Sequence, residues 1–230
     1  MERPVSVCVF AKPPRPGSVK TRLELGRERT AALARAFFLD TWAMVQSLPW
    51  ARTILATTDG AAQDFGLAGD IEVWLQGDGD LGERLERVVA RALGDSAFAF
   101  AIGADTPGLP RRFLEQARVA MTRADAVLGP CEDGGFYLLG LTRCPPGLLR
   151  ELPWSNAETF ARTLARLRDQ GMKVHELDPW FDVDLPADLQ RLRALIEQRE
   201  VAAPETAAAL ASIGFAPRRG HGSGIRARAS

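Results

Sequence analysis

The chain of 230 residues is 46% hydrophobic and 25% charged, an ordinary balance for a globular protein of one large domain or two small ones. Its 29 basic and 29 acidic residues give a net charge of zero, but four arginines and no acids lie in residues 216–230. Without those four, 25 basic residues face 29 acidic ones, a net charge of −4. An acidic body argues against nucleic acid as the main partner.

Cysteine usage and hydropathy bear on the compartment. Cys8, Cys131 and Cys144 are widely spaced and form neither a disulfide framework nor a C-x-x-C metal pair, which favours a reducing compartment. The first apolar run breaks after about seven residues, so we expect a strand rather than a secretory signal. No run approaches the roughly 18 apolar residues of a membrane span. We therefore expect a cytoplasmic protein with no membrane partner.

Strand-like and helix-like segments alternate along the chain. Short apolar runs, rich in β-branched and aromatic residues, predict strands at 5–11, 53–57, 71–75, 98–103, 126–129, 136–141 and 173–177. Apolar residues at helical spacing predict helices near 28–48, 80–94, 110–122, 157–170 and 186–199. This alternation indicates a Rossmann-like α/β fold, a mostly parallel sheet with helices on both faces. Ligands of such sheets bind beyond the carboxyl ends of the strands.

The C-terminal part of the chain differs in composition. We expect one transferase-like domain over residues 1–200 and, over 201–230, an Ala-rich segment followed by a basic tail. Residues 201–213 predict a last, loosely packed helix. The Gly/Arg/Ser-rich tail has almost no apolar content, which predicts disorder from about residue 217 onward and dispensability. Phosphate or RNA binding by the tail stays open beside the favoured interpretation of a solvated end.

A basic loop follows the first strand directly. Residues 12–22 contain Lys12, Arg15, Lys20 and Arg22, no acid, three prolines and a glycine. A stiff basic loop at a strand's carboxyl end suits a polyphosphate. It is not a P-loop, because the glycine that must precede the lysine is absent. A solvated basic loop without a ligand is the alternative.

Acidic residues follow two later segments. Asp105 comes directly after the strand at 98–103, where a carboxylate is well placed for a hard divalent cation. Asp182 and Asp184 share one side of an extended segment, because alternate residues point the same way, and one or both can complete a metal shell. The alternative for Asp184 is an N-cap of the next helix, with Asp188 in its first turn.

Two further segments are candidates for the wall of a binding site. Glu132, Asp133, Gly134 and Gly135 lie between strands, where the acids can face a ligand hydroxyl or base and the glycines permit close approach. A polar turn explains the same residues. In the segment Trp154-Ser155, Ser155 or its neighbour Asn156 is expected to start a helix. The alternative for Trp154 is to line an acceptor pocket.

Residues 77–82 satisfy G-x-G-x-x-G, follow a predicted strand and open a predicted helix. This is the context of a dinucleotide fingerprint. The motif lies in the third strand–helix unit rather than the first, and Asp78 and Asp80 would repel a pyrophosphate. We favour contact with a nucleotide base or ribose, and Asp80 is also a candidate N-cap of the helix.

Six of these segments resemble a known family in one order over residues 5–190. They read FAKPPRPGSVKTRL, QGDGDLGERL, IGADTPGLP, GPCEDGGFYLLGL, LPWS and WFDVDLPADL. They are similar to the bacterial glycosyltransferase-A-like transferases often labelled arsenosugar-biosynthesis glycosyltransferases. That family resembles in turn 2-phospholactate guanylyltransferase and the molybdenum-cofactor guanylyltransferases.

The resemblance implies a nucleotide-diphospho-sugar transferase (GT-A) fold and a set of site residues. It implies that the donor phosphates are held by Lys12, Arg15, Lys20 and Arg22. It places Asp105 as the metal-binding aspartate and Asp182 or Asp184 as the second ligand, with Asp105, Lys20 and Arg22 as the catalytic group. It also implies two walls of the binding site. The wall for the nucleotide contains Gly79, Asp80, Gly82 and Glu83. The wall for the acceptor contains Glu132, Asp133, Gly134, Gly135, Trp154 and Ser155. Departures from the family pattern, at Gly108, Cys131, Asn156 and Leu185, bear on the acceptor.

The sequence therefore predicts group transfer from a nucleotide-activated donor to a small-molecule acceptor with Mg²⁺ or Mn²⁺. Transfer of a sugar from a nucleotide sugar is the leading hypothesis. Nucleotidyl transfer, in which an acceptor phosphate attacks an NTP and pyrophosphate leaves, is the close alternative. A non-catalytic nucleotide-binding protein is the remote one. The oligomeric state stays open.

Overall fold

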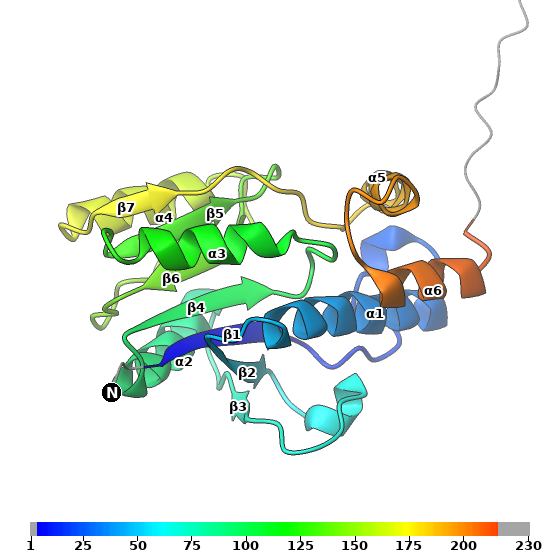
Figure 1. The fold of residues 1–230 in the computed structure, drawn as a ribbon, viewed down its shortest axis with the longest axis horizontal. Coiled ribbons are helices and arrows are strands. Elements are labelled where there is room, and N and C mark those ends of the chain that lie inside the picture. Colours follow the sequence, from blue (N-terminus) through cyan, green and yellow to red (C-terminus); the bar gives the residue numbers. More distant parts are fainter. Residues whose placement is uncertain (1–3, 216–230) are drawn as a thin grey trace, which may run out of the picture.

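A computed structural model describes residues 4–215 of the chain (Figure 1). Its sheet has seven strands in the order β3-β2-β1-β4-β6-β5-β7. The strands are β1 Val5–Ala11, β2 Ala51–Thr57, β3 Val73–Leu75, β4 Phe98–Gly103, β5 Ala126–Pro130, β6 Phe136–Leu141 and β7 Val174–Glu176. β6 runs antiparallel to both of its neighbours, and the other pairs are parallel. The predicted mostly parallel α/β sheet is confirmed.

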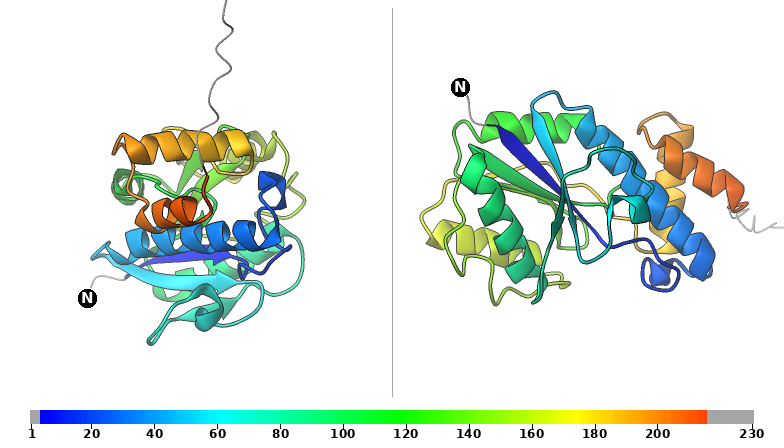
Figure 2. Two further views of the ribbon diagram at one scale, coloured as in Figure 1. Left: turned by 90° about the vertical axis from the view of Figure 1, so that its right-hand side faces the viewer. Right: turned by 90° about the horizontal axis from the view of Figure 1, so that it is seen from below.

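Helices cover both faces of this sheet (Figure 2). They are α1 Arg27–Gln46, α2 Leu81–Asp95, α3 Arg111–Ala120, α4 Thr159–Asp169, α5 Pro186–Glu197 and α6 Pro204–Ser212, with short 3₁₀ turns at Thr21–Leu23 and Ala62–Phe65. The five helices expected from apolar spacing are thus present, with ends shifted by up to two residues. Among the described residues, no helix is both long and apolar enough to cross a membrane.

Alternate residues of β1 enter two separate cores. Val7 and Val9 are fully buried with side chains of α1 and α3, whereas Cys8 is fully buried with side chains of α2 and α4. The pleat produces this division, since successive side chains of a strand point to opposite faces. It explains why β1 is apolar throughout rather than alternating.

A third core joins the C-terminal helices to α1 (Figure 1). Leu210 of α6 is buried there, and buried Asp40 of α1 caps α6 by accepting the backbone N–H groups of Glu205 and Thr206 at 3.0 and 2.8 Å. The helix expected in 201–213 is present as α6, but the expectation that it packs loosely was wrong, and the folded body extends past residue 200. Residues 216–230, for which disorder was predicted, lie outside the described part of the chain.

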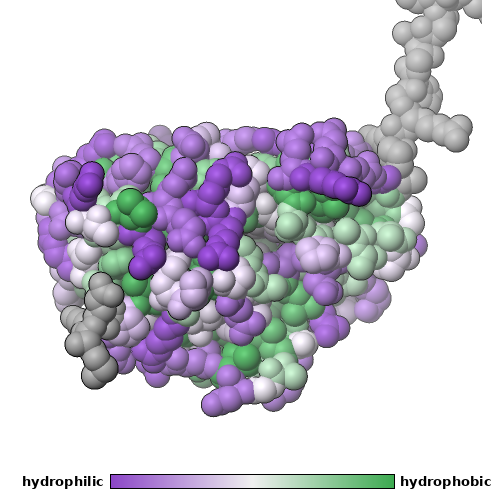
Figure 3. Space-filling view, viewed as in Figure 1, coloured by the Kyte–Doolittle hydropathy of each residue, from purple (hydrophilic) through white to green (hydrophobic). Residues whose placement is uncertain are grey.

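Large apolar side chains are exposed at scattered places. Leu75, Leu81, Val119 and Leu185 are each more than 40% exposed. On the face drawn in Figure 3, apolar patches are interrupted by hydrophilic side chains. Scattered exposure of this kind is ordinary for a folded domain.

Candidate active site

A cavity of about 590 Å³ lies at the carboxyl ends of β1 and β4. β1 and β4 are neighbours, but the chain continues from β1 to β2 and β3 on one side, while the strands after β4 lie on the other. Such a switch point leaves a crevice in which α/β sheets bind ligands. Four basic and four acidic residues line the cavity: Lys12, Lys20, Arg22, Arg84, Asp105, Asp133, Asp182 and Asp184.

Lys20 joins the basic loop to two of the predicted acids. Its Nζ lies 2.8 Å from Oδ1 of Asp105 and 2.8 Å from Oδ1 of Asp184. Arg22 reaches the other oxygen of Asp184 at 3.5 Å. The Lys20 side chain is only 5% exposed. Burial by itself lowers the pKa of Lys20, but the carboxylates of Asp105 and Asp184 outweigh it and raise that pKa overall, so the ammonium stays charged.

The backbone of the basic loop is held in an unusual conformation at Lys20. Its φ is 47°, in the left-handed region that non-glycine residues seldom adopt. Such a conformation costs on the order of 1 kcal/mol and persists only where contacts impose it. The ion pairs of Lys20 and the burial of Leu23, 1% exposed in the third core, supply those contacts.

A second acidic group lies beside this one. The ligand atoms of Cys131, Asp133 and Asp182 all fall within 4.8 Å of one another. A parallel bridge between Cys131 and Trp180 brings their two chain segments together beyond the end of β5. Burial, then Asp133, then Asp184 raise the pKa of Asp182 to about 6. Burial, followed by Asp182 and Asp133, also raises the pKa of the Cys131 thiol, which keeps it protonated at neutral pH.

This group fits a hard divalent cation. Asp133 and Asp182 offer carboxylate oxygens, the ligands that Mg²⁺ and Mn²⁺ prefer, while a protonated thiol is a poor ligand for either. The raised pKa of Asp182 reflects its burial first and the nearby negative charge of Asp133 and Asp184 second, and a cation would relieve that crowded charge. The predicted set of Asp105, Asp182 and Asp184 is thus divided, because Lys20 binds Asp105 and Asp184. Asp133, interpreted as an acceptor residue, joins Asp182 instead. The adjacent acids before two glycines were the only signal for it.

Asp184 does not cap α5, so that alternative was wrong. The carboxylate of Asp188 accepts the backbone N–H groups of Leu185 at 2.7 Å and Asp184 at 3.1 Å. Asp188 therefore takes the capping role from within the first turn, and the Asp184 side chain is left to Lys20 and Arg22.

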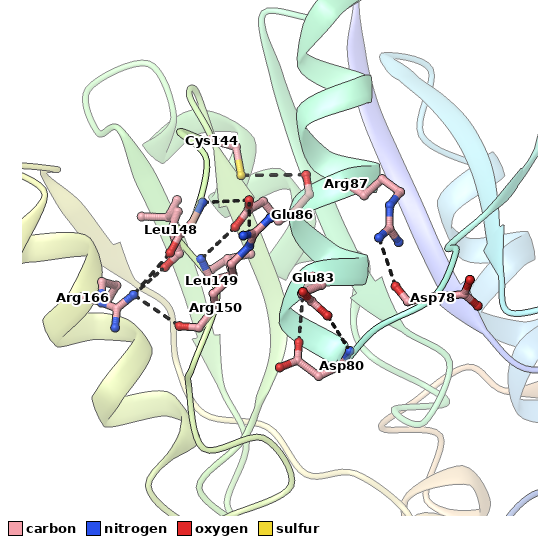
Figure 4. Close-up of polar contacts among 11 residues, drawn as sticks. Asp78, Asp80, Glu83, Glu86, Arg87, Cys144, Leu148, Leu149, Arg150 and Arg166 are labelled. Carbon is pink, nitrogen blue, oxygen red and sulfur yellow. Dashed lines mark hydrogen bonds and ion pairs between the residues drawn. The ribbon is translucent and has the colours of Figure 1, made fainter.

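Polar contacts join the loop before α2 to the first two turns of that helix (Figure 4). Asp80 accepts the backbone N–H of Glu83 at 2.9 Å, and Glu83 accepts that of Asp80 at 3.1 Å, which confirms the predicted N-cap and makes a capping box. Arg87 donates to the carbonyl of Asp78 at 3.0 Å and to that of Gln76. The loop is therefore fastened by its own helix.

The residues of this loop that line the cavity are not the ones expected. Gly79, Asp80, Gly82 and Glu83 are absent from its lining, whereas their neighbours Gln76, Leu81 and Arg84 contribute to it. Gly82 has a packing role, since a Cβ there would lie 2.0 Å from the carbonyl oxygen of Leu149. Sequence reasoning missed Arg84 as an individual residue, because its pattern is that of an ordinary exposed helix position.

Two other charged candidates lie outside the lining of the cavity. Arg15 pairs with Asp59 at 2.7 Å, and both side chains are more than half exposed. Glu132 accepts two hydrogen bonds from Arg191, at 2.6 and 2.9 Å, and these bonds lower the pKa of its carboxyl. Neither Arg15 nor Glu132 lines the cavity. Both are engaged in surface ion pairs in this conformation.

The remaining acceptor candidates divide in the same way. Ser155 and Gly135 line the cavity. Trp154 does not; its ring packs edgewise on Phe136, which does line the cavity, with centroids 6.0 Å apart. Gly134 admits the backbone of Ala157, whose oxygen would lie 2.1 Å from an added Cβ. Neither Ser155 nor Asn156 caps α4, because Glu158 occupies the N-cap position without a side-chain cap; the Asn156 side chain instead accepts the N–H of Glu158 at 2.9 Å in the turn before the helix.

Comparison with known proteins places the chain in a family. Residues 41–156 match the family model DUF2064, described as an uncharacterized protein conserved in bacteria. The chain belongs to this family. No curated protein matches this DUF2064 chain significantly in sequence.

Solved structures share the fold of this DUF2064 protein. A crystal structure from Desulfovibrio desulfuricans G20, provisionally named a nucleotide-diphospho-sugar transferase, is 28% identical, with a TM-score of 0.83 over 94% of this chain and 96% of that one. A cytidylyltransferase from Leptospira borgpetersenii is 12% identical, with a TM-score of 0.56 over 93% and 96%. A CMP:2-keto-3-deoxy-manno-octonic acid synthetase complexed with CTP is 16% identical, with a TM-score of 0.56 over 85% and 99%. The predicted nucleotide-diphospho-sugar transferase fold is confirmed, and these neighbours agree with a transferase.

Proposed function

We propose that this DUF2064 protein transfers a group from a nucleotide-activated donor to a small-molecule acceptor, with Mg²⁺ or Mn²⁺. The observation that carries the proposal is a single cavity, at the switch point of the sheet, where Lys12, Lys20 and Arg22 stand beside Asp105, Asp133 and Asp182. Cations for donor phosphates and carboxylates for a metal are thereby within reach of one ligand. The provisional name of the structural neighbour with a TM-score of 0.83 agrees with this chemistry.

Different residues of the cavity would bind the metal, bind the donor phosphates and position the carboxylates. Asp182 and Asp133 would hold the divalent cation, which when bound neutralises charge developing on the leaving phosphate. Lys12 and Arg22 would bind donor phosphates, adding stabilisation in a partly closed cavity. Asp105 uses Oδ1 for Lys20 but is 63% exposed, which leaves its other oxygen for the cation, as a third ligand beside Asp182 and Asp133. Lys20 positions Asp105 and Asp184 relative to each other.

Transfer of a sugar from a nucleotide sugar is the form of the reaction that we favour. Nucleotidyl transfer from an NTP is the second candidate, because the first loop alone gives the cavity three basic side chains, which suits a triphosphate. Incubation with a panel of nucleotide sugars tests the first through release of a nucleoside diphosphate. Incubation with NTPs and phosphorylated acceptors tests the second through release of pyrophosphate.

Metal dependence is tested by the variant Asp105→Asn. We expect weak Mn²⁺ binding without nucleotide, since Lys20 already neutralises Asp105 and Asp184, and strong mutual enhancement with nucleotide, which supplies part of the coordination shell. Asp105→Asn should keep the fold and lose most of that enhancement. Calorimetry with nucleotide titrated at zero and millimolar Mn²⁺ measures it.

The matched control for this variant is Asp169→Asn, because Asp169 is an exposed acid at the end of α4 and away from this cavity. It should behave as the wild type. Nucleotide affinity that is indifferent to metal in the wild type, or an undiminished metal effect in Asp105→Asn, would contradict the metal-bridged mechanism.

A further inference from the structure

The cations around the cavity differ in whether the protein already satisfies them. Lys20 and Arg22 are bound to Asp184, and Arg15 is bound to Asp59. The side chain of Arg84, by contrast, makes no hydrogen bond and no ion pair with any residue that the structure describes, and its Nε is buried without a partner. Buried donors are nearly always paired, so an unpaired guanidinium beside a cavity indicates a group that a ligand satisfies.

The position of Arg84 on α2 directs it toward the ligand site. Leu81, Arg84 and Leu85 stand at i, i+3 and i+4, which places them on one face of the helix. All three line the cavity. Leu85 continues from there into the core that α2 forms beneath β1 and β4. Arg84 is therefore the residue at the boundary between that core and the cavity.

Arg84 and the basic loop are supported by different hydrophobic cores on either side of the cavity. Lys20 and Arg22 come directly before Leu23, which is buried in the third core with α5 and α6. α2 belongs to the core on the other face of the sheet. Lys12, at the end of β1, lines the same cavity and likewise makes no hydrogen bond or ion pair in the described part of the chain. Lys12 and Arg84 are thus the two cationic residues of the cavity that make no ion pair with a described residue, while Arg22, 67% exposed, keeps part of its guanidinium open beside its 3.5 Å contact with Asp184.

We infer that Arg84, together with Lys12, binds a phosphate group of the nucleotide-activated donor on the α2 side of the cavity. A planar guanidinium can make two parallel hydrogen bonds to one phosphate, which a lysine cannot. The inference rests on the proposed function, and it assigns donor binding to a residue outside the first loop. The positive end of the α2 dipole acts in the same direction, since Arg84 lies in its first turns.

The test uses inorganic pyrophosphate as the probe and calorimetry as the measurement. Arg84→Gln should weaken pyrophosphate binding at least about tenfold, and Arg84→Lys should weaken it less, because charge remains while the bidentate geometry is lost. The melting temperature of Arg84→Gln should stay at or above that of the wild type, because the variant removes an unsatisfied buried donor.

Arg91→Gln is the matched control, because it removes the same charge from the same helix. The Arg91 guanidinium lies over the ring of Trp74, 4.0 Å from its centroid, and Arg91 does not line the cavity. Pyrophosphate binding should be unchanged in this variant. Equal affinity in wild type and Arg84→Gln, equal losses in Arg84→Gln and Arg91→Gln, or no binding by the wild type would each overturn the inference.

Donor turnover separates this inference from the proposed function. If pyrophosphate binding depends on Arg84 but no nucleotide sugar or NTP is consumed, the anion site stands and the proposed transfer fails. If a donor is consumed and Arg84→Gln leaves its KM unchanged, the transfer stands and the role of Arg84 is overturned.

Discussion

Asp182 connects the electrostatics of the site to the stability of the fold. Its pKa is raised from 3.8 to about 6, mainly by burial and then by Asp133 and Asp184, with Lys20 opposing. A carboxyl whose pKa is higher in the folded state binds its proton more tightly there than in the unfolded chain. Its stabilising contribution is therefore present below the unfolded pKa and is lost as the pH rises through about 6. Near neutral pH the protein carries the cost of an ionised, crowded carboxylate.

Asp182→Asn should therefore stabilise the metal-free protein at neutral pH. We expect a gain of about 1 to 2 kcal/mol, since each pKa unit corresponds to about 1.4 kcal/mol and solvent screening of this partly buried group reduces the sum. The gain should vanish below about pH 3, where Asp182 is protonated in both states because its ordinary pKa is 3.8. Urea denaturation with a chelator, at several pH values, measures it. A gain that is independent of pH would contradict the assignment, and Asp169→Asn should show no gain.

At the scale of elements, α5 and α6 support both chain segments that carry the site. Leu23 follows Arg22 in the basic loop, and Val183 separates Asp182 from Asp184. Both are buried in the core that Leu189 of α5 and Leu210 of α6 help to form. Packing of the C-terminal helices is thus the means by which Lys20 meets a carboxylate 164 residues away.

The cap that Asp40 provides for α6 is the contact through which this support can be tested. Asp40→Ala removes one partly buried and one buried hydrogen bond, at 3.0 and 2.8 Å, and leaves two backbone N–H groups without this partner. We expect a loss of about 1 to 3 kcal/mol of unfolding free energy, together with faster proteolysis between α5 and α6. Weaker nucleotide binding should follow, since the third core also holds Leu23. Thermal denaturation and limited proteolysis measure the change.

The control for this prediction is Asp169→Ala, which removes an exposed acid from the end of α4. It should leave stability, proteolysis and nucleotide binding unchanged. Unfolding of Asp40→Ala at the wild-type temperature, with α6 equally protected from protease, would show that the cap does not fix this helix.

At the scale of the whole molecule, strand order determines where a ligand acts. The carboxyl ends of β1 and β4 meet at the switch point, and Lys12 and Asp105 follow those two strands. The connections at the other end of the parallel strands, where their amino ends lie, contain none of the residues that line the cavity. A ligand should therefore stabilise the segments at the carboxyl ends of these strands more than those at the amino ends.

Hydrogen exchange with and without nucleotide and Mn²⁺ tests this asymmetry. We expect slower exchange in the basic loop, in the residues after β4 and in the first turn of α2, because ligand binding suppresses local opening. Exchange should change little in the connections at the amino ends, such as residues 47–50 and 122–125. Uniform protection, or protection confined to the amino ends, would contradict the location of the site.

The sequence by itself determined the elements and the segments that carry the chemistry. The runs predicted at 5–11, 98–103 and 136–141 coincide with β1, β4 and β6, and Asp80 caps α2 as expected. These features depend on apolar periodicity and on side chains within a few residues of one another, so they can be predicted from the sequence alone. The basic loop and the acids at 105, 182 and 184 were recognisable for the same reason.

Only the tertiary structure decided how these groups are paired. Lys20 lies between Asp105 and Asp184, Asp182 joins Asp133, and Arg15 and Glu132 are engaged with Asp59 and Arg191. Each pairing is a competition among several opposite charges, decided by distance and burial after distant segments have packed. The antiparallel direction of β6 and the unpaired Arg84 guanidinium likewise follow from long-range contacts. A pattern along the chain gives residue types and spacing, but ion pairs and strand pairing depend on positions in space that the packed cores set.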